Sequence, residues 1–149
     1  MTTLVDIRDA VYESILVSKD KLVITDFDLF KTYYPQTKIQ EIAKPRVFVV
    51  GLQWSEEKLS RGNSRQLDLP VQVAIQDKVL PSNTEEIDFL VCFTEQLRRL
   101  VSKVECSGIV WTNTDPMLDP NGTALSFMEL HEEHLFQATF TAHFIAAVC

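Results

Sequence analysis

The chain has 149 residues, with 14 Lys or Arg and 21 Asp or Glu, so its formal net charge is −7. Hydrophobic residues make up 46% and charged residues 23%, a balance that is typical of one globular domain and excludes wholesale disorder. The sequence has no apolar run approaching the ~18 residues that a membrane-spanning helix needs, and it lacks the basic stripe of nucleic-acid-binding modules.

The N-terminal residues and the cysteines indicate the cellular compartment in which the chain is made. Residues 1–6 lack the basic start and apolar core of a secretory signal peptide. Cys92, Cys106 and Cys149 are too few and too scattered for a disulfide framework, so we expect a protein made in a reducing cytoplasm. Cys92 lies beside the apolar face of a predicted helix, and we interpret it as a small core residue.

The first predicted helix covers residues 4–16, where Leu4, Ile7 and Val11 recur at helical spacing. A face of this kind is stable only when it is buried against another element. The stretch 22–34 that follows has a mixed pattern and predicts only a short strand or a loop.

The longest predicted helix covers residues 84–104. Ser82 and Glu85 match a capping box at its start, and Asn83 or Thr84 are alternative caps. Its apolar face repeats at helical spacing and comprises seven residues: Ile87, Leu90, Val91, Leu97, Leu100, Val101 and Val104.

Four segments predict strands. Residues 47–50 form a continuous β-branched and aromatic run, typical of a strand covered on both faces. Residues 67–76 alternate between apolar and polar positions, although Pro70 within them indicates a sheet edge or a bulge. Residues 109–112 predict a short strand, and residues 136–148 predict one long alternating strand.

This order of elements predicts a single α+β domain over residues 1–149. We expect a mostly antiparallel sheet with two main helices packed on one face. The strands 47–50 and 67–76 are expected neighbours, joined by a long hairpin loop at 55–65. Residues 113–122 are rich in turn formers. Long strands with open edges invite pairing with another chain, so a neighbouring subunit is a natural cover.

Enzymatic motifs are scarce. His131-Glu132-Glu133-His134 is the cluster that most resembles a metal site, but the zincin motif needs its two histidines four residues apart on a helix. A solvated acidic turn is the favoured interpretation, and a small metal-dependent hydrolase is the alternative. The sequence contains no Gly-rich phosphate loop and no nucleophile elbow. We therefore expect no enzyme, no catalytic residue, no cofactor and no bound metal.

The segment Arg61-Gly62-Asn63-Ser64-Arg65 is a candidate contact with another subunit or a partner. Its two guanidinium groups suit carboxylates, and a solvated loop is the alternative interpretation. Residues 104–149 contain six acidic residues and no Lys or Arg, so this part of an adjacent copy would be a suitable electrostatic target. A simple solvated acidic surface explains the same charges.

The order of these features resembles the tail terminator, or tail completion, proteins of long-tailed bacteriophages. The features that carry the resemblance are, in chain order, the amphipathic first helix, the strand after Pro45, the loop ending in Ser60–Arg65, the alternating strand at 67–76, the helix at 84–104, the turn Asn113-Thr114-Asp115-Pro116 and the closing strand at 136–144.

The resemblance implies a structural virion protein at the neck of the phage tail. It implies a ring, usually a hexamer, that ends tail-tube polymerisation at the head-proximal end and provides the surface to which the head and neck attach. The implied partners are other copies of the chain, the tail tube protein and a neck or connector protein, with no membrane. Genomic DNA would pass transiently through the ring, and we hypothesise that Glu129, Glu132 and Glu133 line part of that channel. Another neck ring protein, a head–tail connector or stopper, is the alternative.

Overall fold

The computed structural model describes residues 4–32, 44–51, 55–58, 65–106, 108–116 and 134–148. The elements are, in chain order, α1 (Leu4–Val17), the short 3-10 helix η1 (Lys19–Lys21), β1 (Asp28–Thr32), β2 (Arg46–Gly51), β3 (Ser55–Lys58), β4 (Arg65–Lys78), α2 (Thr84–Val101), β5 (Ile109–Pro116) and β6 (Leu135–Val148).

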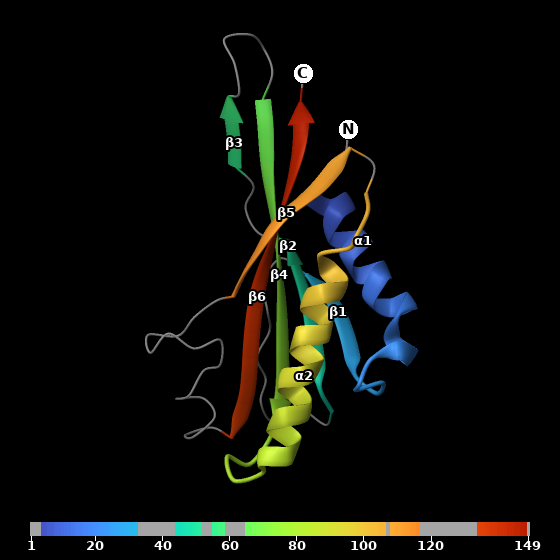
Figure 1. Ribbon diagram of the computed structural model, residues 1–149, viewed down its shortest axis with the longest axis vertical. Helices are drawn as coiled ribbons and strands as arrows, with labels where there is room; N and C mark the ends of the chain where they lie inside the picture. The colour runs from blue at the N-terminus through green and yellow to red at the C-terminus, as the bar shows by residue number, and fades with distance from the viewer. Residues whose placement is uncertain are drawn as a thin grey trace.

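The strands form one twisted sheet in the order β1-β2-β4-β6-β5, with β3 paired beside β4. All of these pairs are antiparallel except β1 and β2, which run parallel. Both helices lie on the same face of the sheet (Figure 1). The predicted α+β fold, a mostly antiparallel sheet with two helices on one face, is therefore confirmed.

The centre of the sheet is the pair formed by β4 and β6. Their 14-residue strands pair over their whole length, from Arg65 opposite Val148 to Lys78 opposite Leu135. Side chains alternate between the two faces of a strand. The helix-facing row of β6 is buried and consists of Phe136, Ala138, Phe140, Ala142, Phe144 and Ala146.

The helices complete this core as their spacing predicts. From α1, Leu4, Ile7, Val11 and Ile15 are buried, and all seven predicted apolar residues of the second helix are buried or packed against the core. The sequence prediction missed Phe93, whose fully buried ring meets that of Phe27 edge-on at 5.0 Å between centroids.

Cys92 was assigned to the core, and this prediction is wrong because its side chain is exposed. The reason lies in the helical periodicity. At roughly 100° per residue, Cys92 lies about 200° around the helix from the buried Leu90, on the solvent side.

The predicted pairing of the strands at 47–50 and 67–76 is confirmed, because β2 and β4 are antiparallel neighbours. The loop that joins them is shorter than the predicted 55–65. Ser55–Lys58 forms β3, which pairs antiparallel with residues 65–68 of β4. The sequence of β3, Ser-Glu-Glu-Lys, has no apolar alternation, so no periodicity predicts this strand.

Pro70 lies in a central strand, so the predicted sheet edge is wrong. It is paired opposite His143 of β6. On the other side of β4, pairing with β3 ends at Asp68 and pairing with β2 begins at Val71. The pairing of β4 with β6 runs through Pro70 without a register shift, so the alternative of a bulge is not seen on this side of the strand either.

The turn-rich segment predicted at 113–122 begins later than expected. β5 continues to Pro116, and its register with β6 shifts between Trp111 and Asn113. A bulge of this kind lets a strand continue through residues that favour turns. Residues 117–122 lie outside the described part of the chain.

Asn83 caps α2. Its side-chain oxygen accepts a hydrogen bond from the Glu86 backbone N–H at 3.3 Å, and its Nδ2 donates to the Glu86 carboxylate at 2.9 Å. The cap is thus one of the two alternatives to the predicted Ser82–Glu85 pair. The Glu86 carboxylate accepts from the Asn83 side chain, whereas in a capping box it would accept from the backbone N–H of the cap residue.

We expect Asn83→Ala to lower the free energy of unfolding by about 1 kcal/mol, because the first turn of α2 loses an acceptor for a backbone N–H. Urea denaturation followed by circular dichroism measures this change. Ser82→Ala is the matched control and should change the free energy by less than half as much. Equal losses in the two variants would show that Asn83 is not the cap.

Candidate functional site

The sequence-predicted contact residues fall mostly outside the described ranges. This applies to Arg61–Ser64 and to Glu129, Glu132 and Glu133. Arg65 is the first residue of β4, where its backbone pairs between β3 and β6. The proposed roles of these residues in subunit contact and channel lining therefore stay predictions.

The metal-site alternative rests on His131 and His134. His131 lies outside the described part, and His134 is exposed just before β6 with a positive φ of 53°. His143 lies in β6, where its Nδ1 is 3.4 Å from Asp68 Oδ1. Among the residues that the structure describes, no three His, Cys, Asp or Glu side chains gather in a way that could hold a metal ion.

The two strands that end the sheet order, β1 and β5, each carry an exposed apolar side chain. Phe30 of β1 is 43% exposed and Val110 of β5 is 63% exposed. Val110 pairs directly opposite Ile145 of β6. Phe30 lies in the same row across the sheet as Thr139 of β6, because successive strand pairs connect them through β2 and β4. Ile145 and Thr139 are an even number of residues apart in β6, so both apolar side chains lie on the helix-free face.

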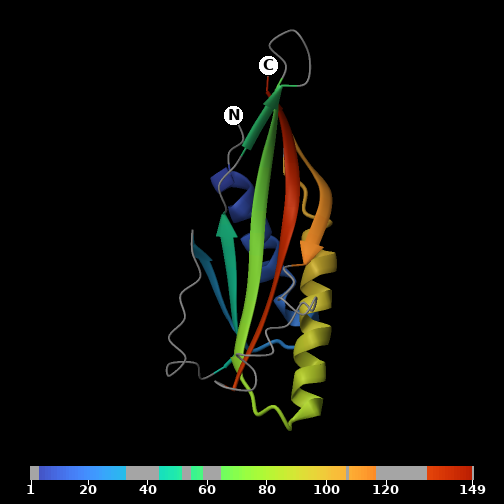
Figure 2. The ribbon, with the colours of Figure 1, turned by 90° about the vertical axis from the view of Figure 1, so that its left-hand side faces the viewer.

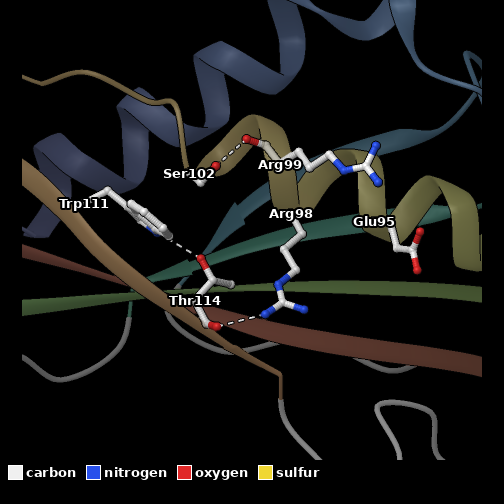
Figure 3. Close-up of a pocket in the computed structure, with 6 residues that line it drawn as sticks. All are labelled: Glu95, Arg98, Arg99, Ser102, Trp111 and Thr114. Atoms are coloured by element: carbon white, nitrogen blue, oxygen red, sulfur yellow. Dashed lines mark hydrogen bonds between the residues drawn. The ribbon is translucent and has the colours of Figure 1, made fainter.

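Beside β5, the C-terminal end of α2 forms a basic hollow next to an aromatic ring (Figure 3). Arg98 Nη2 donates to the Thr114 carbonyl at 3.0 Å, and Trp111 Nε1 donates to Thr114 Oγ1 at 2.9 Å. Both side chains are therefore held in place by the same residue of β5. The hollow has a volume of about 510 Å³ and is lined by Glu95, Arg98, Arg99, Ser102, Trp111 and Thr114.

A second hollow, of about 670 Å³, shares Trp111 with the first, and Lys103, Val110 and Cys106 contribute to its lining. Trp111 and Ser102 thus line both hollows, whereas Val110 lines only the second. This part of the surface combines apolar area with cationic groups, a composition that suits protein contacts more than small apolar ligands.

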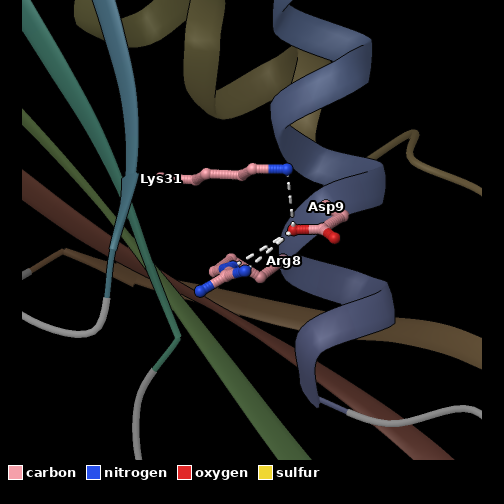
Figure 4. Close-up of polar contacts among 3 residues, drawn as sticks. All are labelled: Arg8, Asp9 and Lys31. Carbon is pink, nitrogen blue, oxygen red and sulfur yellow. Dashed lines mark hydrogen bonds and ion pairs between the residues drawn. The ribbon is translucent and has the colours of Figure 1, made fainter.

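At the opposite edge of the sheet, on the same face, α1 and β1 are joined by a small charge cluster (Figure 4). Arg8 donates to Asp9 Oδ1 through Nε and Nη2 at 3.2 and 3.1 Å, and Lys31 Nζ lies 3.6 Å from the same oxygen. Lys31 also lies over the Tyr12 ring, 5.1 Å from its centroid. Lys31 thus connects β1 to α1, and because its pair with Asp9 is partly exposed, this contact orients the helix and adds little stability.

Lys44 makes a more exposed pair just before β2. Its Nζ lies 3.1 Å from Asp26 Oδ1 and 3.5 Å from Asp28 Oδ1. The hydrogen bond to Asp26, followed by the attraction of both carboxylates, raises the pKa of Lys44 above its usual value. Because solvent screens such exposed pairs, this contact orients the start of β2 and adds little stability.

The helix-free face has its own small apolar cluster of Phe48, Val50 and Ala74. Phe30 stacks on Phe48 with 5.3 Å between ring centroids, and the Arg46 guanidinium lies 5.6 Å from the Phe48 centroid. Phe30 is therefore exposed on one side and supported on the other. An edge residue held in this way is well suited to contact a neighbouring molecule.

None of the helices that the structure describes is long and apolar enough to cross a membrane. Sequence reasoning predicted open sheet edges but named none of Phe30, Arg98, Val110 and Trp111. The sequence offered one signal for Val110. In a strand it points to the opposite face from Ile109 and Trp111, both of which pack against the core. No protein-family model matches this chain, and the search of curated proteins found no match either.

Proposed function

We propose that this protein is a structural component of a bacteriophage virion that forms a ring at the head-proximal end of the tail tube. In this role it ends tube polymerisation and provides the attachment surface for the head and neck. The single observation that carries the proposal is the pair of outer strands, β1 and β5, each with an exposed apolar side chain on the same face of the sheet. The order of elements, which resembles tail terminator proteins, supplies the biological context.

The physical reason is that an open strand edge is a ready surface for another chain. When two different surfaces of identical subunits meet, the repeated contact gives a closed ring if its rotation closes and a filament if it does not. A terminator needs closure, because a filament would continue the tube. The hexameric number is taken from the resemblance alone.

The proposal also names the partners and the place of the protein. One face of the ring would bind the last ring of tube protein, and the other would bind a neck or connector protein. The opening would let genomic DNA pass, with the acidic Glu129, Glu132 and Glu133 repelling its phosphates. Residues 61–65 would contact an adjacent copy or a partner. No catalytic chemistry is part of this role.

Deletion of the gene from its phage tests the proposal. We expect headless tails of uncontrolled length beside filled heads, because nothing would stop tube growth. Electron microscopy of the lysate measures tail length, and expression of the wild-type chain from a plasmid is the control that should restore normal particles. Tails of normal length beside heads that leak DNA would instead identify a connector or stopper. Stoichiometric zinc in the purified protein, with normal particles after deletion, would favour the hydrolase.

A further inference from the structure

Two surfaces at opposite edges of the sheet carry this inference. We call the surface made by Arg98, Arg99, Val110 and Trp111 the α2–β5 rim, and the surface made by the outer side of α1 together with Phe30 the α1–β1 rim. Figure 2 shows the sheet with β1 on one side and with β5 and α2 on the other. The two rims therefore face away from each other within one subunit.

We infer that copies of this chain join head to tail, with the α2–β5 rim of one copy packed against the α1–β1 rim of the next. The inference rests on the ring of the proposed function and specifies its subunit contact. The occupant of the basic hollow beside Trp111 is thus a second copy of this chain.

The apolar parts of the two rims match. Val110 and Phe30 are both exposed and lie on the helix-free face, so a side-by-side contact that continues the sheet brings them to the same side of the joint. Phe30 is already supported by its stack on Phe48, and Trp111 is fixed by its hydrogen bond to Thr114. Little side-chain freedom remains to be lost on contact, which favours association.

The charges of the two helices are complementary. The last turn of α2 carries Arg98 and Arg99. The helix α1 carries three acidic residues, of which Asp9 is already paired with Arg8 and Lys31. Asp6 and Glu13 are exposed, and they are the carboxylates that could face a neighbouring copy. Figure 1 places the C-terminal end of α2 at the height of α1 along the long axis, so copies standing side by side in the same orientation bring these two helix segments to the same level. Figure 3 shows that the Arg99 guanidinium extends away from Thr114. Such a pairing orients the partners and speeds their encounter.

A head-to-tail contact uses two different surfaces, and this makes a mixing experiment decisive. Val110→Lys damages only the α2–β5 rim, and Phe30→Lys damages only the α1–β1 rim. We expect wild type to form closed oligomers in sedimentation velocity, and each variant alone to be monomeric, with association weakened at least about tenfold. An equal mixture should form dimers and nothing larger, because each pair has one intact contact.

Two further variants keep the experiment interpretable. Leu80→Lys changes an exposed residue in the turn between β4 and α2, away from both rims, and should assemble like wild type. Glu13→Lys is a second α1–β1 variant on the helix surface, to be used in place of Phe30→Lys if that chain fails to fold by circular dichroism. It should also give dimers with Val110→Lys, since the intact rims are the same.

Several results would overturn the inference. They are a wild-type chain that stays monomeric across the concentration series, continued assembly of either rim variant alone, and absence of dimers in the mixture. Self-association of one variant alone would identify a two-fold contact between like edges. These outcomes leave the deletion phenotype unaffected, because tail length after deletion does not depend on which surfaces pair. Failure of this contact and failure of the proposed function are therefore distinguishable.

Discussion

Replacing Phe93 with alanine is expected to lower the free energy of unfolding by about 3–5 kcal/mol. The Phe93 ring is fully buried between α2 and the sheet and meets the Phe27 ring edge-on at 5.0 Å. Removing the ring breaks its buried apolar contacts and leaves a cavity. The surrounding close-packed side chains relax only partly into such a cavity, so most of the loss remains. Urea denaturation followed by intrinsic fluorescence and circular dichroism measures the loss.

Phe89→Ala is the matched control on the same helix. Phe89 is 56% exposed, so the same chemical change should alter the free energy of unfolding by less than about 1 kcal/mol. A loss in the control as large as that of Phe93→Ala would mean that α2 is rotated relative to the sheet. Comparable, small losses in both variants would show that α2 contributes little to the core.

Asp77→Asn is expected to stabilise the protein at alkaline pH by about 2–3 kcal/mol. Asp77 is only 7% exposed and lies in β4 on the side of the helices. Burial, reinforced by repulsion from Glu86 and opposed by a hydrogen bond from the Lys78 backbone, raises its pKa from 3.8 to about 6. The charged carboxylate is therefore disfavoured in the folded state.

The sign of the pH dependence follows from that shift. Because the folded-state pKa is the higher one, the folded state binds a proton more tightly than the unfolded state. The penalty from ionised Asp77 is complete above pH 6 and disappears as the pH falls below 3.8. Unfolding free energies should thus differ between Asp77→Asn and wild type at pH 8 and converge at pH 4. Glu85→Gln, which removes an exposed carboxylate from the first turn of α2, is the control and should not stabilise the protein at pH 8.

The helices were predictable because their information is local. Apolar residues at helical spacing in α1 and α2 specify a buried stripe wherever the helix packs, and Leu90, Leu97 and Val101 lie in that stripe as expected. The same geometry excludes Cys92. Cys92 is a small apolar residue, but its angular position on the helix decides which face it lies on, and that position is exposed.

The sheet was less predictable because strand pairing is non-local. Nothing in the sequence of β3 signals a strand, and the central position of Pro70 depends on its pairing with β6, which is distant in sequence. The parallel placement of β1 beside β2 likewise needs tertiary contacts that no periodicity encodes. Strand propensity reflects such neighbours more than an intrinsic backbone preference.

The candidate site divides in the same way into features that local sequence predicts and features that only the strand order reveals. The long strands predict open edges, but which strands lie at the ends of the sheet depends on the whole strand order. Val110 and Phe30 became candidates only when their exposure and their common face were known. The loop at 61–65, chosen for its two arginines, was favoured by local charge alone.

The full-length pairing of β4 with β6 also governs when the molecule can acquire its structure. Residues 65–78 find their central partner only in residues 135–148. During translation the nascent sheet therefore lacks its middle until the second of these segments has left the ribosome, and native topology is reached late. Chains dominated by such distant pairings refold slowly compared with helical bundles of similar size. Until β6 docks, the apolar side of β4 is open to chaperones and to aggregation.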